Sequence, residues 1–365
     1  MSEKMKILKM LESGTISATE AATLLQSLEK GEDVAMPVPN SQTHTPEPAP
    51  KRDIVREWEP RVKSFTETVA EKIADGAEYL SKALSSPSTP KHTPPAVSHK
   101  GTATEQSIEM LVVPGYNELN LAGLNGEVRI KGYNGDKITA KLHFRKKNPR
   151  ANIELMKLGN KYFLKYDLDE FERVSLDAYV PERLFNIIKI EGINCRVDIT
   201  SLASGDIVIS NQHGDTHLAG IACNNFSAEG GNGKFIISNI IADNAKIENV
   251  NGSVDASELD IERLSLTNYN GPLSLIMSKY DRYSNYDWRV ETGNAKLNMH
   301  LPTLPSLGYH IKAHAAMSEI RLGLTGMQFL INDKSLVEAR SVSFESSSKK
   351  VKLAVETSNA PLVIN

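Results

Sequence analysis

The chain has 365 residues, with 42 Lys and Arg against 45 Asp and Glu, so its formal net charge is −3. This near-neutral balance and an aromatic content of 6% argue against a nucleic-acid binder that relies on bulk electrostatics and base stacking. Two cysteines, Cys195 and Cys223, are too few for a disulfide scaffold, and no apolar run is long enough to span a bilayer.

Two proline-rich stretches divide the chain. Residues 31–52 and 85–103 lack apolar periodicity, which predicts extended linkers. They separate a head (1–30), a middle segment (53–84) and a body (104–365). The charged N-terminus has no apolar core of the kind a signal peptide needs. The sequence therefore predicts a cytoplasmic protein, with membrane association or cell-surface placement as the alternatives.

The head predicts a helical hairpin that serves oligomerisation or interaction. Gly14 ends the first helix, and Ser17 with Glu20 fits a capping box at the start of the second. About 30 residues bury too little surface to fold alone. We therefore expect the hairpin to pair with a copy of itself or to dock on a partner, the alternative being packing on its own body. The interaction residues expected here are Leu8, Leu11, Leu24, Leu25 and Leu28.

The middle segment, residues 53–84, predicts an amphipathic helix. Apolar residues recur at spacings of three, four and their sums, while charges of both signs occupy the opposite face. This face needs a partner, and the balanced charges favour a protein over a membrane surface. The contact residues expected on this segment are Trp58, Val62, Phe65, Val69, Ile73 and Leu80.

The body contains a short internal repeat with a fixed period. Asn194-Cys195 is followed in register by His213-Gly214, Asn232-Gly233, Asn251-Gly252 and Asn270-Gly271. Apolar residues alternate between these pairs, which indicates strands. The fold class predicted is mainly β: a right-handed parallel β-solenoid with coils of about 19 residues, each made of three short strands. Glycine and asparagine accept the backbone angles of a repeated corner, so this column is interpreted as structural.

Two regions depart from the period. Residues 136–188 and 304–350 contain longer alternating segments, which predict antiparallel hairpins. Such hairpins would cap the open ends of the solenoid, where strand edges are otherwise exposed.

The sequence offers weak signals for chemistry. It has no nucleophile elbow, P-loop or HExxH motif, and Cys195 and Cys223 are expected to be inert. A metal site is conceivable at His213, Asp215 and His217, or at His310 and His314, but corner and surface histidines are the favoured interpretation. We therefore predict no catalytic residue, no metal and no cofactor.

One cluster of carboxylates is a candidate for the acid and base of a glycosidase. Asp243, Glu262 and Asp281 fall in one predicted column of successive coils. Each of the last two precedes an arginine, Arg263 or Arg282. A charge-compensated, solvated corner is therefore favoured over a glycosidase pair.

The head and the body together resemble a known group of proteins. Gly14, Ile16, Ser17, Glu20 and the Leu24-Leu25 pair resemble the short N-terminal helical module of YvlB-like and LiaX-like proteins of Gram-positive bacteria. The NG-x-V-x-I repeats are similar to the β-solenoid domain, called a putative adhesin, that follows in the same proteins. The resemblance implies a role in the cell-envelope stress response and sensing of membrane-active peptides, with no catalytic residues.

Three functions follow, in order of preference. The first is a non-enzymatic scaffold, sensor or regulator of the cell-envelope stress response that binds a protein partner, a membrane surface or a membrane-active peptide. The second is a surface adhesin, and the third is a carbohydrate-active enzyme. No nucleic acid and no small-molecule substrate are expected.

Overall fold

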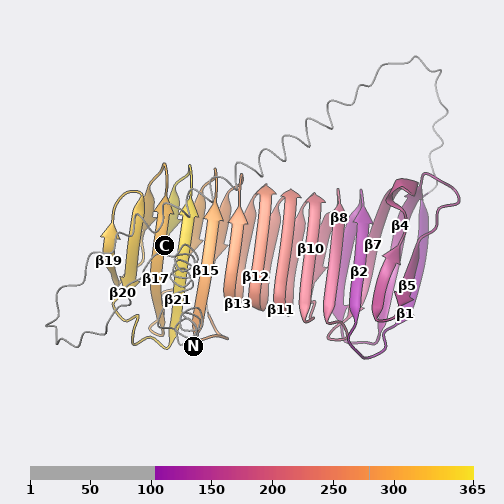
Figure 1. Ribbon diagram of the computed structural model, residues 1–365, viewed down its shortest axis with the longest axis horizontal. Helices are drawn as coiled ribbons and strands as arrows, with labels where there is room; N and C mark the ends of the chain where they lie inside the picture. Colours follow the sequence, from indigo (N-terminus) through magenta and orange to yellow (C-terminus); the bar gives the residue numbers. More distant parts are fainter. Residues whose placement is uncertain (1–102, 279) are drawn as a thin grey trace, which may run out of the picture. The chain divides into compact units, whose positions relative to one another are not determined.

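The computed structural model describes residues 103–278 and 280–365. These residues form 22 strands of one hydrogen-bonded sheet and a single 3-10 turn, and they include no α-helix. Within this part of the chain no helix is long and apolar enough to cross a membrane. Figure 1 shows the strands side by side along the described part.

The first group of strands mixes parallel and antiparallel pairs. β1 pairs antiparallel with β4, β4 with β7, and β5 with β6, whereas β2 and β3 run parallel to the later strands β8 and β9. The elements are β1 (Thr104–Leu111), β2 (Glu118–Leu124), β3 (Glu127–Tyr133), β4 (Lys137–Lys146), β5 (Glu154–Leu158), β6 (Lys161–Lys165), the 3-10 turn η1 (Leu168–Glu170) and β7 (Phe171–Pro181).

The middle group is parallel and in uniform register. Phe226 lies opposite Ala245, and Ala245 lies opposite Leu264, so each strand is offset from the next by one period of the repeat. The strands are β8 (Ile187–Ile193), β9 (Arg196–Thr200), β10 (Asp206–His213), β11 (Thr216–Asn232), β12 (Phe235–Asn251) and β13 (Val254–Asn268).

The last group of strands begins after an insertion that lengthens the sequence offset between paired strands. Leu264 on β13 pairs with Trp288 on β15, which lies further along the chain than one period of the repeat. β15, β21 and β17 are parallel, and β20 continues antiparallel to β17 and β19. The strands are β14 (Leu273–Ile276), β15 (Asn285–Thr292), β16 (Leu297–His300), β17 (Leu307–Ala315), β18 (Ile320–Leu322), β19 (Met327–Asn332), β20 (Leu336–Ser341), β21 (Lys349–Thr357) and β22 (Leu362–Ile364).

Alternation along the strands separates the core from the outer surface. Successive residues of a strand point to opposite faces, so every second position faces inward. One such row crosses the sheet and is buried along its length, which fills the interior with apolar side chains stacked strand upon strand. It contains Ile188, Ile207, Phe226, Ala245, Leu264, Trp288, Leu353 and Ile311.

The predicted fold class, a right-handed parallel β-solenoid with hairpin caps preceded by helices, is wrong for the described residues. Their sheet is mixed, and its pairings close a ring of seven strands: β2, β8, β10, β11, β9, β3 and β7. The prediction divided each repeat into three short strands, but β11 and β12 are each a single strand of 17 residues. The predicted helices, 1–30 and 53–84, lie outside the described residues.

The physical reason is a bend at which one residue is unpaired while the register on both sides is kept. Gly220, Asn239 and Glu258 occupy equivalent positions and have positive φ angles of 67°, 53° and 52°. These residues turn the strand while the flanking residues keep their parallel partners. Strand β11 can therefore pair with β10 along one half and with β9 along the other, which closes the ring.

Two asparagine columns mark the repeated corner. In the buried column, Asn268 Nδ2 donates to the carbonyls of Gly271 at 2.6 Å and Gly252 at 3.0 Å, and Asn249 lies on the preceding strand. In the exposed column, Asn251 Nδ2 donates to Asn232 Oδ1 at 2.8 Å and Asn270 Nδ2 to Asn251 Oδ1 at 2.9 Å. In both columns, side-chain hydrogen bonds connect the corner of one repeat to the corner of the next.

Candidate functional site

A groove of about 610 Å³ crosses the outer face of β10, β11, β12, β13 and β15. These strands lie next to one another in Figure 1, and their backbone pairing is continuous. The outward side chains that line the groove form two columns: Asp206, Asn225, Asn244, Arg263 and Asp287 in the first, and Val208, Ser227, Lys246, Ser265 and Arg289 in the second.

The two columns follow directly from the repeat. Residues two positions apart on a strand share a face, and the parallel register places each beside its equivalent on the next strand. Adjacent strands are about 4.8 Å apart, so the polar groups recur at that interval across the sheet. The short side chains of Ser227 and Ser265 on either side of Lys246 leave the floor of the groove open.

Hydrogen bonds connect the first column into a ladder. Asn225 Nδ2 donates to Asp206 Oδ1 at 2.7 Å, and Asn244 Nδ2 donates to Asn225 Oδ1 at 2.9 Å. Arg263 Nε donates to Asn244 Oδ1 at 2.6 Å. Because each amide is bonded on both sides, the ladder holds its polar groups in a fixed order.

Carboxylates compensate the cations of the groove. Lys246 Nζ lies 3.1 Å from Glu248 Oε2, and Arg263 Nη1 lies 3.2 Å from Glu262 Oε2. Arg289 pairs with Glu291 and lies 3.6 Å from Glu356 Oε1. The outward side chains of the groove therefore carry hydrogen-bonding groups without a large excess of either charge, while most of the surface that lines the groove is apolar.

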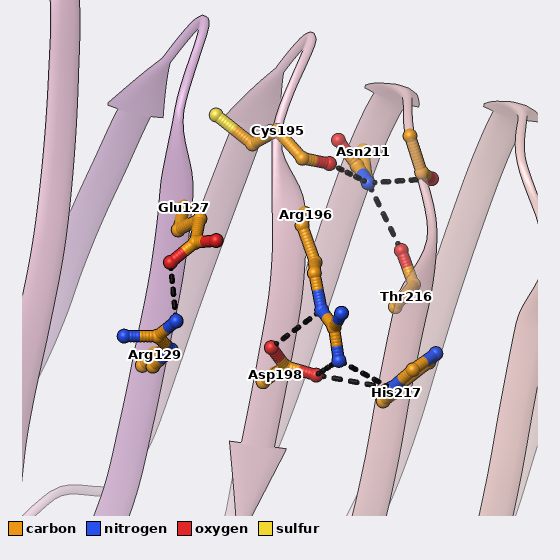
Figure 2. A network of polar contacts seen from close by, with 9 residues as sticks. Glu127, Arg129, Cys195, Arg196, Asp198, Asn211, Thr216 and His217 are labelled. Carbon is orange, nitrogen blue, oxygen red and sulfur yellow. Dashed lines mark hydrogen bonds and ion pairs between the residues drawn. The ribbon is translucent and has the colours of Figure 1, made fainter.

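A second polar network lies on β3, β9 and β11 (Figure 2). Asp198 accepts a hydrogen bond from Arg196 Nε at 2.9 Å, and its other oxygen lies 3.0 Å from His217 Nδ1. Glu127 and Arg129 form a neighbouring ion pair. This surface is a set of compensated charges and contains no activated nucleophile.

Three of the histidines considered as metal ligands, His213, His217 and His310, have other polar partners in the structure. His213 Nδ1 lies 2.7 Å from Asn232 Nδ2, within the exposed asparagine column, whereas His217 faces Asp198. His310 Nε2 contacts Glu338 Oε1 at 2.8 Å, and burial lowers the pKa of His314. Among the described residues, no group of three or more His, Cys, Asp or Glu side chains could hold a metal ion.

The predicted carboxylate column is broken by the insertion. Asp243 and Glu262 remain in equivalent positions of β12 and β13, but the longer offset to β15 removes Asp281 from their column. Asp243 Oδ1 accepts a hydrogen bond from Tyr283 Oη at 2.7 Å, and Glu262 pairs with Arg263. The bond from Tyr283 attaches the insertion to β12, and both carboxylates are engaged by neighbours instead of forming a pair poised for acid–base chemistry.

Neither Cys195 nor Cys223 forms a disulfide. Burial raises the pKa of Cys195, and burial with the nearby Asp206 and Asp243 raises the pKa of Cys223 to about 12. A thiolate is the reactive form of cysteine, so neither side chain is activated near neutral pH.

The interaction residues expected on the head and the middle segment lie outside the described residues, and their roles stay predictions. Sequence reasoning missed the groove. The available signal was that the polar residues Asn225 and Asn244 recur with the period of the repeat, between the apolar positions used to recognise strands.

Comparison with known families gives two matches. The family model described as Toastrack DUF4097 matches residues 116–359, and a SHOCT-like domain model matches residues 2–33. Among curated proteins, none matches this chain.

Several solved structures are similar at low identity. A putative adhesin from Bacteroides fragilis is 12% identical, with 72% of this chain and 97% of that chain covered and a TM-score of 0.40. A putative lipid binding protein from Parabacteroides distasonis is 8% identical, with 73% and 98% covered and a TM-score of 0.38. A putative cell adhesion protein from Clostridium sporogenes is 12% identical, with 72% and 99% covered and a TM-score of 0.30.

Proposed function

This chain belongs to the Toastrack family, and on that basis we propose that it is a non-enzymatic, adhesin-like binding protein whose ligand lies in the groove across β10, β11, β12, β13 and β15. The observation that carries the proposal is the ladder from Asp206 to Arg263, which presents ordered polar groups on a rigid sheet. Rigid presentation lowers the entropy cost of binding.

A catalytic role has less support. The cations of the groove are paired with carboxylates, and Asp243 and Glu262 are engaged by Tyr283 and Arg263. General acid–base catalysis needs groups whose protonation state is tuned to the reaction. The described residues of this surface include no such pair, which favours the proposed binding role over a catalytic one.

The finer role that we propose is in the cell-envelope stress response. The body would hold an envelope component in the groove, while the head (1–30) and the middle segment (53–84) would bind a protein partner or a membrane surface. Support comes from the SHOCT-like match over residues 2–33 and from the apolar faces of both segments in the sequence.

A pelleting assay tests the groove as the binding site. The full chain is mixed with purified cell-wall sacculi or with phosphatidylglycerol vesicles, and the bound fraction is measured for the wild type and for Lys246→Ala. The matched control is Lys234→Ala, which removes a lysine that pairs with Asp255 at 2.6 Å, outside the groove. We expect at least a tenfold loss of binding for Lys246→Ala alone. Equal binding by all three proteins would refute the assignment of the site.

A further inference from the structure

From the geometry of the groove we infer its ligand class: an uncharged linear polysaccharide that lies across the β-strands, with successive sugars on successive strands. This inference rests on the proposed function. It is carried by the direction of the polar columns, by the hydrogen-bonding capacity of their amides and hydroxyls, and by the pairing of their charges.

The spacing of the columns suits a polymer. From β10 to β15 the groove crosses four strand intervals of about 4.8 Å, roughly 19 Å in all. An extended chain of β-linked pyranose sugars advances by a similar distance per sugar. A strand of about four sugars would therefore place one sugar beside each of Asn225, Asn244 and Arg263.

The ladder retains capacity for such a ligand. An asparagine amide has two N–H donors and an oxygen with two lone pairs. The ladder bonds from Asn225 and Asn244 each use one donor, and each of these oxygens accepts one ladder bond. The remaining donor and lone pair can bind sugar hydroxyls or an N-acetyl group, and Ser227 and Ser265 add hydroxyls along the floor.

The pairing of charges decides against a charged polymer. A polyanion would have to compete with Glu248 for Lys246 and with Glu262 for Arg263. A polycation could reach the carboxylates of Asp206 and Asp287, but it would be repelled by the three cations of the lining, Lys246, Arg263 and Arg289. A neutral polyhydroxylated chain leaves these ion pairs intact and gains hydrogen bonds, including bonds from the N–H donors of Lys246 that Glu248 does not occupy.

Two other ligand classes fit less well. A peptide that adds a strand to a sheet needs a free strand edge. The groove lies on a sheet face whose strands are paired on both sides. A lipid surface needs an exposed apolar patch. Val208 is the one large apolar side chain among the described lining residues that is exposed, at 38%.

The residues that line the groove also determine the expected affinity for the polysaccharide. Phe226 is the aromatic residue among the described residues of the lining, and it is 2% exposed, so it offers no stacking surface to a sugar. Each sugar then contributes hydrogen bonds that replace bonds to water, which add modestly to affinity. Affinity should therefore rise with chain length until the groove is filled.

The test measures binding of chitooligosaccharides, from dimer to hexamer, to the full chain by calorimetry. Ser265→Trp fills the groove with a bulky side chain. Its matched control, Ser257→Trp, places the same residue at an outward position of β13 outside the groove. Thermal unfolding of both variants verifies the fold. Polygalacturonate serves as the charged-polymer arm.

We expect the hexamer to bind at least tenfold more tightly than the dimer, and Ser265→Trp to weaken hexamer binding at least tenfold while Ser257→Trp does not. Preferential binding of polygalacturonate in the groove would overturn the inference. So would the absence of oligosaccharide binding while pelleting with sacculi or vesicles still depends on Lys246, an outcome that leaves the proposed function standing. If pelleting is also independent of Lys246, both proposals fail.

Discussion

At residue 252 the backbones of successive strands approach too closely for a side chain. Gly252 has φ +125°, and a Cβ there would lie 2.0 Å from the carbonyl oxygen of Gly233. The neighbour is backbone and cannot move aside as a side chain could. We expect Gly252→Ala to lower the free energy of unfolding by about 3 kcal/mol, the upper part of the usual range for single substitutions. Urea unfolding of the purified protein measures the loss.

Gly159 provides the matched control for steric contact. Its φ is +60°, but a Cβ at this position would meet nothing within 4 Å. Gly159→Ala should therefore cost only the left-handed backbone strain, about 1–2 kcal/mol. Equal losses for the two variants would show that the approach of the strands at Gly252 is not the controlling factor.

The two asparagine columns should differ in energetic weight. Asn268 is fully buried, and its amide satisfies the carbonyls of Gly252 and Gly271. Asn268→Ala leaves these acceptors without that donor, at a cost of about 2–3 kcal/mol. Asn251→Ala removes an exposed amide that water can replace, at a cost below about 1 kcal/mol. Chemical unfolding of both variants tests this order, and a larger loss at Asn251 would contradict it.

Cys223 makes stability depend on pH on the alkaline side. The pKa of this thiol is about 12 in the fold and near 9 in the unfolded chain. Because the unfolded state loses its proton first, the thiol's contribution is complete below about pH 9 and is lost as pH rises to 12. We expect Cys223→Ala to flatten the decline in unfolding free energy over this interval. Parallel declines for the two proteins would contradict the prediction.

At the scale of elements, the insertion between β14 and β15 is held by tyrosine hydroxyls. Tyr286 Oη donates to Asp260 Oδ1 at 2.8 Å and accepts from the backbone N–H of Tyr283 at 3.1 Å. Tyr286→Phe should cost about 1–2 kcal/mol, because both partly buried bonds are lost while the ring is retained. Tyr179→Phe, at a ring that is 47% exposed, is the control and should change unfolding by less than about 0.5 kcal/mol. Comparable losses in thermal unfolding would argue against a holding role for Tyr286.

The sequence predicts the repeated corner and the buried positions correctly, but it does not predict where the strands begin and end. The spacing from Asn232 to Asn251 follows from one corner repeated on each strand, and apolar alternation marks residues such as Ile237 and Ile247, both fully buried. The predicted strand ends are wrong because Asn239 bends β12 while the residues on both sides of it keep the same register with β13. Propensity alone cannot distinguish such a bend from a corner that ends a strand.

The candidate site was hidden for a related reason. Asn225 and Asn244 are typical turn residues in isolation, and only the parallel register places them side by side with Arg263. Likewise, Asp281 was assigned to a column by extending the period of the repeat, but the insertion shifts the next paired strand further along the chain, as the pairing of Arg263 with Asp287 shows. Tertiary pairing, which local sequence does not encode, decided both outcomes.

At the scale of the whole molecule, we propose that the body binds the ligand and that the head mediates self-association. The body stacks its apolar rows internally, whereas the apolar stripe predicted on the head, which includes Leu24 and Leu25, is proposed to bind a partner because about 30 residues bury too little surface to fold alone. Self-association through the head would place several grooves on one assembly, and linked weak sites gain avidity through effective concentration. Several weakly binding grooves on one oligomer would then bind a single polymer chain tightly, because the polymer offers the same binding unit many times.

Analytical ultracentrifugation of the full chain tests this arrangement. We expect the wild type to sediment as an oligomer and the double variant Leu24→Lys, Leu25→Lys to sediment as a monomer, because charges on the stripe prevent burial of the apolar face. Gln26→Lys adds a charge to the same predicted helix outside the predicted stripe and should leave the oligomer intact. A wild type that is monomeric throughout a concentration series would contradict self-association, and avidity for long polysaccharides would then have to arise from a single groove.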